Sequence, residues 1–422
     1  MTERLYYANS FLYDFVAALL ERRVLADGRT ALVLDRTAFY PTSGGQVFDS
    51  GWLELEPLET ERGHFLPKLR VVEVAETDDG EILHIVEGGG DATLPTEDGA
   101  TRVRGFIDVE RRRDHMQQHS GQHVLSAAFV ELFQMPTVSF HMGEQSCTID
   151  LEAKGLSQEQ VRQAEARANQ VIWEDRLVSM QLATEEEARA LGVRKIPAAG
   201  HEKLRLVGVK DFDLCACGGT HVHSTGQIGT LLIRKTEKVK QGVRAEFVCG
   251  ERAARHARRD FETLSETAAI FSTHVWELPT QIRKAQEEAR ASSKREHKLL
   301  ERIAELSAGE LLARTAEDKG TKLIAQVLAE SDLEYTKLLA QKLTAGAPNL
   351  VALLGAGSGQ AALVFAQSPG LPHDMGALMK ASMVALGGRG GGTRDMAQGG
   401  APNAEGLGRA IDEARAAILS RL

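Results

Sequence analysis

The chain has 422 residues, 43% of them hydrophobic, and a formal net charge of −9 at pH 7, which is typical of a globular protein of about three domains. The acidic balance argues against indiscriminate nucleic-acid binding but not against a local basic face. No apolar run approaches the roughly 20 residues of a membrane span, and the start of the chain lacks a signal-peptide pattern, so a cytoplasmic protein without a membrane partner is expected. Four cysteines are too few for a disulfide framework and fit a reducing compartment.

The sequence pattern changes three times and predicts a multidomain α+β protein. Short alternating apolar runs between glycines come first, then mixed helix and strand patterns, then a helical stretch, and finally an α/β pattern. The predicted parts are an N-terminal β-barrel at 1–105, an α+β domain at 106–250, a helical or coiled-coil spacer at 251–314 and a C-terminal α/β domain at 315–422. The 3–4 spacing of apolar residues also makes the spacer a candidate dimer contact.

A glycine pair in the predicted barrel lies beside polar side chains. The segment Phe39–Gln46 reads Phe-Tyr-Pro-Thr-Ser-Gly-Gly-Gln. Gly44 and Gly45 taken alone indicate a tight turn. Thr42 and Gln46 nevertheless place a hydroxyl and an amide where the backbone can approach a ligand closely, so the segment is a candidate binding site.

Two short motifs in the second domain are typical of the two halves of a zinc site. His119 and His123 are four residues apart in a helix-compatible run, 109–133, and this spacing puts both imidazoles on one helix face. Cys217 and His221 are also four apart, across a Gly-Gly pair that lets a thiolate and an imidazole converge on one ion. Either motif alone is a common coincidence of buried residues, whereas both together predict a metal site.

The first motif argues against one activity. A zinc peptidase helix reads His-Glu-x-x-His, in which the glutamate is the general base. Ser120 occupies the position of that glutamate. Protease chemistry is therefore not expected.

Strands and basic residues surround these motifs. The predicted strands of this domain are 137–141, 146–151, 178–182, 204–209, 228–234 and 243–248. Ser157 and Gln160 predict a capping box for a helix that runs to about Asp175. Basic residues cluster before the first motif, including Arg111–Arg113, and again at 234–244. Such residues form either a solvated face or a surface for a phosphate backbone.

The last hundred residues predict helices at 321–343, 373–386 and 406–422 and strands at 350–354 and 361–366. The glycines at 355–359 do not form a dinucleotide site, because a strand-like run follows where that motif requires a helix. The segment Gly387–Gly400 is predicted to be a glycine loop. Its Arg389 and Arg394 would present guanidinium groups to phosphates or a base.

The order of these landmarks resembles a known family. The segment Phe39–Gln46 with Asp49, the two His/Cys motifs and the terminal glycine segment follow one another as in the editing half of alanyl-tRNA synthetase. Because no room precedes them for an aminoacylation domain, the chain resembles the freestanding alanyl-tRNA editing proteins of the long AlaX type. The resemblance covers nearly the whole length, and the two His/Cys motifs are its most specific part.

The resemblance implies a zinc-dependent aminoacyl-tRNA deacylase. Its substrate would be tRNA(Ala) mischarged with serine or glycine, and its C-terminal part would be similar to the DHH-associated domain that grips tRNA and supports dimers. The implied zinc (Zn²⁺) ligands are His119, His123, Cys217 and His221. Gln46 matches the glutamine of the family's glycine motif, and Thr42 lies where a hydroxyl would meet the serine side chain.

The ligand set is compatible with three roles for the zinc. Four protein ligands close a tetrahedral zinc, whereas catalytic zincs keep an open position. Either the ion expands to five-coordinate, or one ligand is absent, or zinc only positions the 3′ end. Two other functions also remain, a non-catalytic tRNA-binding protein with structural zinc and a zinc hydrolase of small amides. Cys215, His141 and His223 have no assigned role.

Overall fold

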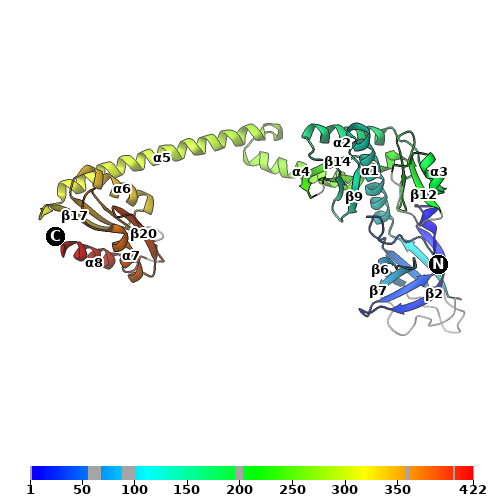
Figure 1. Ribbon diagram of the computed structural model, residues 1–422, viewed down its shortest axis with the longest axis horizontal. Helices are drawn as coiled ribbons and strands as arrows, with labels where there is room; N and C mark the ends of the chain where they lie inside the picture. The colour runs from blue at the N-terminus through cyan, green and yellow to red at the C-terminus, as the bar shows by residue number, and fades with distance from the viewer. Residues whose placement is uncertain are drawn as a thin grey trace. The chain divides into compact units, whose positions relative to one another are not determined.

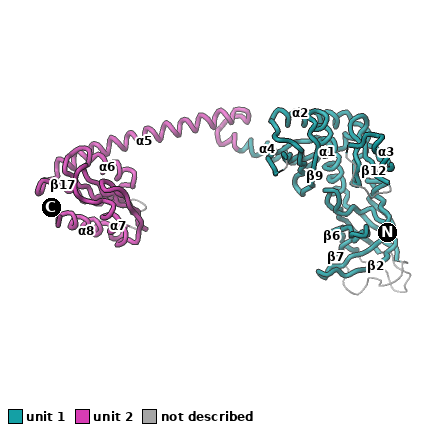
Figure 2. Tube along the Cα trace, in the orientation of Figure 1, with its two compact units in different colours: residues 1–266 teal, residues 267–422 magenta. Residues whose placement is uncertain are grey.

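The computed structural model describes residues 2–55, 68–87, 101–194, 203–240, 242–357, 361–402 and 404–421. The chain divides into two compact units, 1–266 and 267–422 (Figure 2). The finer division into four domains stays a prediction. Among the described helices, none has the length and apolar character that crossing a bilayer requires.

Six antiparallel strands close into a barrel in unit 1, which confirms the predicted barrel. Around the barrel the strands are β2 (Asp14–Val24), β3 (Thr30–Leu34), β7 (Ile82–Glu87), β6 (Lys68–Glu76), β5 (Gly51–Leu55) and β8 (Arg102–Ile107) (Figure 1). Alternating side chains such as Leu32, Leu53 and Leu69 are fully buried and fill the interior. Beside the barrel, β1 (Glu3–Arg4) pairs in parallel with β4 (Arg36–Thr37), and the short 3-10 helix η1 (Leu5–Tyr7) follows β1.

The helix that carries the first histidine motif is the centre of the second half of unit 1. Helix α1 (Val109–Phe133) begins at Asp108, whose carboxylate accepts a hydrogen bond from the Arg111 N–H, and ends at Gln134, which has a φ of 55°. Every residue at 118–129 is buried. The helix is enclosed because α2 (Gln158–Trp173) and a four-stranded sheet pack around it, and no amphipathic face is exposed there.

That sheet is antiparallel, in the order β14 (Leu231–Val239), β15 (Gly242–Cys249), β10 (Cys147–Leu151) and β9 (Thr137–Met142). A second sheet contains β11 (Val178–Ala183), β12 (Leu204–Val209) and β13 (Asp213–Ala216), with α3 (Glu185–Ala190) after β11 and the 3-10 helix η2 (Thr225–Ile228) after β13. The six predicted strands and the Ser157–Gln160 capping box are present. Strand β13 was not predicted, and it leads directly into Cys217.

One member of the predicted basic face lies in the interior. Arg112 is fully buried and pairs with the fully buried Asp49. Its guanidinium also donates to the backbone carbonyl of Ser10 at 2.7 Å, so it joins α1 to the start of the chain and to the barrel. Both interpretations of the basic cluster, a solvated face and a surface for phosphates, are therefore wrong for Arg112. A buried charge needs a buried partner, and only the fold brings Asp49 to it.

Helix α4 (Gly250–Ile270) runs across the division between the units and is followed by the 3-10 helix η3 (Val275–Glu277) and by α5 (Leu278–Arg314). Unit 2 has a six-stranded sheet, in the order β16 (Glu317–Asp318), β17 (Thr321–Leu328), β18 (Leu350–Ala356), β19 (Ala361–Gln367), β21 (Met396–Ala401) and β20 (Arg389–Gly392). Its other helices are α6 (Leu333–Gly346), α7 (Met375–Ala385) and α8 (Leu407–Leu419) (Figure 1). Ala304 and Ala308 of α5 are buried in a cluster with residues of α6.

Two predictions for unit 2 are wrong. Residues 321–328 form strand β17, not a helix, because they pair in parallel with the fully buried strand β18. The segment Gly387–Gly400 is not a loop but contains the antiparallel hairpin of β20 and β21. Its glycines allow α7 to lie close to the sheet, since a Cβ at Gly399 would be 2.6 Å from the sulfur of Met383.

Candidate metal centre

The fold brings the four side chains of the two motifs together. His119 and His123 project from α1, and Cys217 and His221 follow β13. One ligand atom of each lies within 4.8 Å of those of the others. The Cys217 Sγ is 3.4 Å from Nε2 of His119 and 3.3 Å from Nε2 of His221. The three histidines are buried and Cys217 is half-buried.

The barrel supplies an acceptor that orients His119. Nδ1 of His119 lies 2.7 Å from Oε1 of Gln46, and because a carbonyl oxygen only accepts, Nδ1 carries the proton. The same oxygen accepts the Thr220 N–H at 3.1 Å, and the Gln46 amide donates to the Thr220 hydroxyl at 2.9 Å. Gln46 is fully buried. Nε2 of His119 therefore keeps its lone pair for a metal ion.

The Gly44-Gly45 pair explains how Gln46 reaches this position. Ser43 and Gln46 exchange two backbone hydrogen bonds of 3.0 and 2.9 Å, and the two glycines between them have φ values of 58° and 83°. Positive φ at both central positions is the geometry of a type I′ turn. A Cβ at Gly45 would also lie 2.4 Å from the Phe140 carbonyl oxygen. The tight turn at Gly44-Gly45 thus places Gln46 where it contacts His119.

Ser120 orients His221 through a hydrogen bond. Its Oγ lies 3.1 Å from Nδ1 of His221 and accepts the Val222 N–H at 3.2 Å. When Nε2 of His221 binds a metal, Nδ1 carries the proton and donates to Ser120. The residue that replaces the peptidase glutamate is therefore buried behind the centre and holds a ligand.

Asp213 faces His123 from the end of the second sheet. Its carboxylate oxygen lies 3.6 Å from Nδ1 of His123, and its two oxygens accept from Arg194 at 2.8 and 3.0 Å. Burial raises the pKa of Asp213, but the nearby His123 ring and Arg194 guanidinium bring this pKa below its ordinary value. An ionised carboxylate behind a histidine is a common outer partner in zinc sites.

The electrostatics favour a thiolate at the centre. Burial raises the pKa of the Cys217 thiol, but the imidazoles of His119, His221 and His123 lower it by more, so its pKa lies well below the ordinary value. Burial lowers the pKa of His221 to about 3. Burial also lowers the pKa of His123, yet Cys217 and Asp213 raise it to about 10. Since zinc binds neutral imidazoles, binding would release the proton of His123.

The close packing of the second motif against His119 depends on Gly219. A Cβ at Gly219 would lie 2.1 Å from Cε1 of His119 and 2.9 Å from Oε1 of Gln46. At Gly218 the nearest atom would be the Tyr7 hydroxyl at 3.5 Å, an ordinary contact. A side chain at position 218 would therefore fit without a steric clash. At Gly219 the absence of a Cβ lets the chain pass directly beside His119.

Arg205 is a functional candidate that the sequence pattern did not indicate. It is 9% exposed and donates to the carbonyls of Cys217 at 2.8 Å and Gly219 at 2.9 Å. It therefore holds the turn that carries the thiolate. Asp213 was also missed, because a partner that acts from behind a ligand has no characteristic spacing from it, and Thr220 was missed although it lies inside the second motif. Ser120 lay inside the first motif and could have been recognised.

The residues fit a zinc ion. Imidazole nitrogens and thiolates are the donor types that zinc takes in proteins, and four of them complete a tetrahedral shell. An oxygen atom lies within hydrogen-bond distance of Nδ1 of His119, at Gln46, and of His221, at Ser120, whereas the Asp213 carboxylate is 3.6 Å from Nδ1 of His123 and makes no hydrogen bond to it. Such outer partners orient histidine ligands in metal sites.

Other predicted residues lie outside the centre. Thr42 is exposed, and its hydroxyl makes no hydrogen bond to any residue that the structure describes. His141 and His223 are exposed, and the His223 ring stacks on Phe11 at 4.1 Å. Cys215 is buried but does not belong to the cluster. Arg389 and Arg394 are in unit 2.

A family model described as "Threonyl and Alanyl tRNA synthetase second additional domain" matches residues 204–244, which include the second motif. Alanine–tRNA ligase of Methanothrix thermoacetophila is 33% identical over 432 residues, or 100% of this chain and 45% of the ligase. The corresponding ligase of Pyrococcus abyssi is 31% identical over 94% of this chain and 42% of its own length. The chain thus spans less than half of these ligases.

A relative of similar length is also found. The alanyl-tRNA editing protein AlaX-L of Pyrococcus horikoshii is 30% identical over 403 residues, which cover 94% of this chain and 94% of that protein. Among solved structures, the C-Ala domain of alanyl-tRNA synthetase from Aquifex aeolicus matches 24% of this chain and 93% of that domain, with a TM-score of 0.22 and 21% identity.

Proposed function

The chain belongs to the family of the alanyl-tRNA editing protein AlaX-L, to which the editing half of alanine–tRNA ligases is related, and we propose that it hydrolyses the aminoacyl ester of mischarged tRNA(Ala). Its substrates would be Ser-tRNA(Ala) chiefly and Gly-tRNA(Ala). The observation that carries the proposal is the buried cluster of His119, His123, Cys217 and His221, which the barrel residue Gln46 joins from a distant part of the chain.

The chain's own residues would hold and orient the reacting groups. The four clustered side chains would bind zinc, which when bound supplies Lewis-acid polarisation or positions the 3′-terminal ribose. Gln46 would fix His119 through Nδ1, and Ser120 would fix His221. An aminoacyl ester is already activated, so no strong protein nucleophile is required.

We assign amino-acid choice to the turn before Gln46. Thr42 is exposed at its entrance, and its hydroxyl has no partner among the described residues, so the hydroxyl is free to meet the serine side chain. A site that hydrogen-bonds a hydroxyl leaves its own polar group unpaired when alanine enters, and such sites discriminate by factors of about 10⁴ or more. Correctly charged alanyl-tRNA would thus be spared.

Replacing Thr42 by valine tests this assignment. Thr42→Val should weaken transition-state stabilisation for seryl-tRNA by about 1–3 kcal/mol with the zinc content unchanged, because one hydrogen bond to the substrate is lost. Ser43→Ala is the matched control, since it removes a neighbouring hydroxyl and leaves the backbone pair with Gln46 intact. Parent-level rates for Thr42→Val on seryl-tRNA would remove Thr42 from the site.

A second function is favoured by one observation. Four protein donors complete a tetrahedral zinc, and a completed site is usually structural. The chain would then be a tRNA-binding protein without catalysis. Deacylation of seryl-tRNA against alanyl-tRNA, measured with the metal-loaded and the chelator-treated protein, separates the two functions. Zinc-dependent release of serine supports the deacylase, whereas tRNA binding without release supports the second function.

A further inference from the structure

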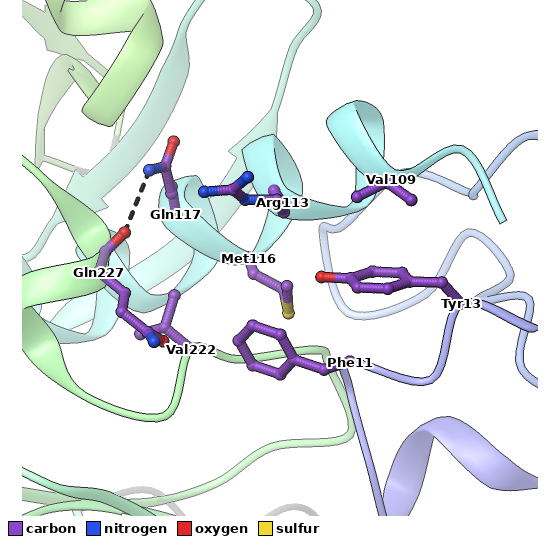
Figure 3. Close-up of a pocket in the computed structure, with 8 residues that line it drawn as sticks. All are labelled: Phe11, Tyr13, Val109, Arg113, Met116, Gln117, Val222 and Gln227. Atoms are coloured by element: carbon purple, nitrogen blue, oxygen red, sulfur yellow. Dashed lines mark hydrogen bonds between the residues drawn. The ribbon is translucent and has the colours of Figure 1, made fainter.

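A cavity of about 340 Å³ lies beside the metal centre in unit 1, a size within the range of small-ligand pockets. Figure 3 shows α1 on one side of it, with Arg113 and Met116, and the residues that precede β2 on the other. The segment after His221 completes the wall. The lining residues are Phe11, Tyr13, Val109, Arg113, Met116, Gln117, Val222 and Gln227.

Aromatic rings form one wall of this pocket. The rings of Phe11 and Tyr13 have centroids 6.2 Å apart and lie at 69° to each other (Figure 3). The His223 ring is stacked on Phe11 at 4.1 Å and 11°, and it holds the Phe11 ring from outside the cavity. Met116 and Val222 add apolar surface. A flat, π-electron-rich ligand would find both apolar area and stacking partners here.

The polar groups of the pocket favour a ligand that carries a negative charge and also has hydrogen-bonding groups. Arg113 is exposed and makes no hydrogen bond or ion pair with any residue that the structure describes, in contrast to its buried neighbour Arg112. The side-chain oxygen of Gln227 accepts from the backbone N–H of His223 at 2.9 Å, while the side-chain nitrogen of Gln227 has no acceptor among the described residues. The Tyr13 hydroxyl is likewise without a partner in the described part of the chain. Among the residues that the structure describes, no carboxylate lines the cavity.

We infer that this pocket binds a nucleotide, with the base against Phe11 and Tyr13 and the phosphate at Arg113. Single-stranded RNA ends are commonly recognised by stacking unpaired bases on aromatic rings while a cation meets the backbone. The assignment of this nucleotide to the single-stranded end of tRNA rests on the proposed function. The nucleotide site itself rests on the chemistry of the pocket.

The residues that line the pocket are close neighbours of the metal centre along the chain and through hydrogen bonds. Val222 lines it and donates its N–H to Ser120, which lies 3.1 Å from Nδ1 of His221. Along α1, Arg113 and Met116 precede His119 by six and three residues, or about 9 and about 4.5 Å of helix rise. A nucleotide held here would therefore be within a short distance of an ester at the metal centre, and it would help to position that ester.

The test uses the full chain and three probes: adenosine 5′-monophosphate, adenosine and ribose 5-phosphate. Saturation-transfer NMR and calorimetry should show the monophosphate binding more tightly than either part of it. Arg113→Gln should weaken monophosphate binding about fivefold at low salt and leave adenosine binding unchanged, because only the charge contact is lost. Phe11→Leu keeps the apolar bulk but removes the flat ring, and it should weaken both nucleoside-containing probes about tenfold.

Arg290→Gln is the matched control, since Arg290 is an exposed arginine of α5 that does not line the pocket. It should bind all three probes as the parent does. Parent-level monophosphate affinity in both Arg113→Gln and Phe11→Leu, or ribose 5-phosphate binding as tightly as the monophosphate, would overturn the nucleotide site. Zinc analysis of each variant shows that the metal centre is intact.

A tRNA measurement separates this inference from the proposed function. If the chain deacylates seryl-tRNA, Arg113→Gln should raise KM more than it lowers kcat. Zinc-dependent deacylation without any binding of the monophosphate would contradict the nucleotide site and leave the proposed function standing. The opposite result is binding of the monophosphate that is lost in the two pocket variants, with no deacylation. That result would support the nucleotide site and contradict the proposed function.

Discussion

Two segments of this chain contain consecutive glycines but have different structural roles. In Cys217–His221 a glycine lets the backbone pass beside the polar side chains of His119 and Gln46. In Gly387–Gly400 most of the glycines lie in strands β20 and β21, and a Cβ at Gly390 or Gly399 would meet side-chain atoms of methionines on α7. The first segment builds a polar centre, and the second allows a helix to pack on a sheet.

The difference shows what a glycine cluster indicates. A glycine cluster predicts that other atoms approach the backbone closely, because glycine has no Cβ to keep them away. Which atoms approach depends on residues that are far away in the chain. Both segments were predicted to face a ligand, and for the second segment the structure shows an apolar helix at that place.

The largest expected effect comes from removing ligands in the first segment and on α1. Cys217→Ala and His123→Ala should each lose zinc and deacylation, because a thiolate and neutral imidazoles form the ion's shell. Metal analysis of the purified variants is the measurement. Cys215→Ala is the control, since this buried cysteine two residues earlier lies outside the cluster and should keep its zinc. Full zinc occupancy in the first two variants would refute the metal centre.

The two glycines of the first segment allow a sharper comparison. Gly219→Ala should lower zinc affinity and deacylation about 10- to 100-fold, because its Cβ would displace His119 and the Gln46 oxygen that orients it. Gly218→Ala should behave like the parent, since its Cβ meets only ordinary contacts. Zinc titration with a competing chelator measures both. Equal affinity for the two variants would mean that the close approach at Gly219 is not required.

The second segment offers the corresponding pair in unit 2. Gly399→Ala should destabilise the packing of α7 on the sheet by about 1–3 kcal/mol, because its Cβ would lie 2.6 Å from the sulfur of Met383. At Gly400 the nearest atom would be 3.8 Å away, so Gly400→Ala should change stability little. Hydrogen exchange of α7 and β21 measures the difference, and zinc content should not change in either variant. Loss of zinc in Gly399→Ala would contradict the separate roles of the two segments.

The smallest expected effect tests whether the second segment also meets tRNA. Arg389 is exposed and makes no hydrogen bond within the described residues, so Arg389→Ala should weaken tRNA binding moderately and reduce its salt slope by about 1. Arg394 donates to the Pro372 carbonyl at 3.2 Å, so its replacement would change the turn as well as the charge. Arg409→Ala on α8, an arginine paired with Glu413, is the control. An unchanged salt slope in Arg389→Ala would remove Arg389 from the tRNA-binding surface.

The sequence alone determined the features whose cause is local. The spacing of His119 and His123 puts both on one face of a helix, because the helix repeats every 3.6 residues. Ser157 marks a helix start, since its side chain caps a free N–H group. The alternating runs of the barrel follow from strand geometry in the same way.

Only the tertiary structure decided which distant residues meet. Gln46 and His119 are 73 residues apart and Ser120 and His221 are 101 apart, yet each pair shares a short contact. The burial of Arg112 beside Asp49 depends equally on how α1 docks on the barrel. No local pattern encodes such pairs, because their partners meet only when the chain is folded, and there the low local dielectric strengthens the hydrogen bonds and charge attraction that offset the cost of burying polar groups.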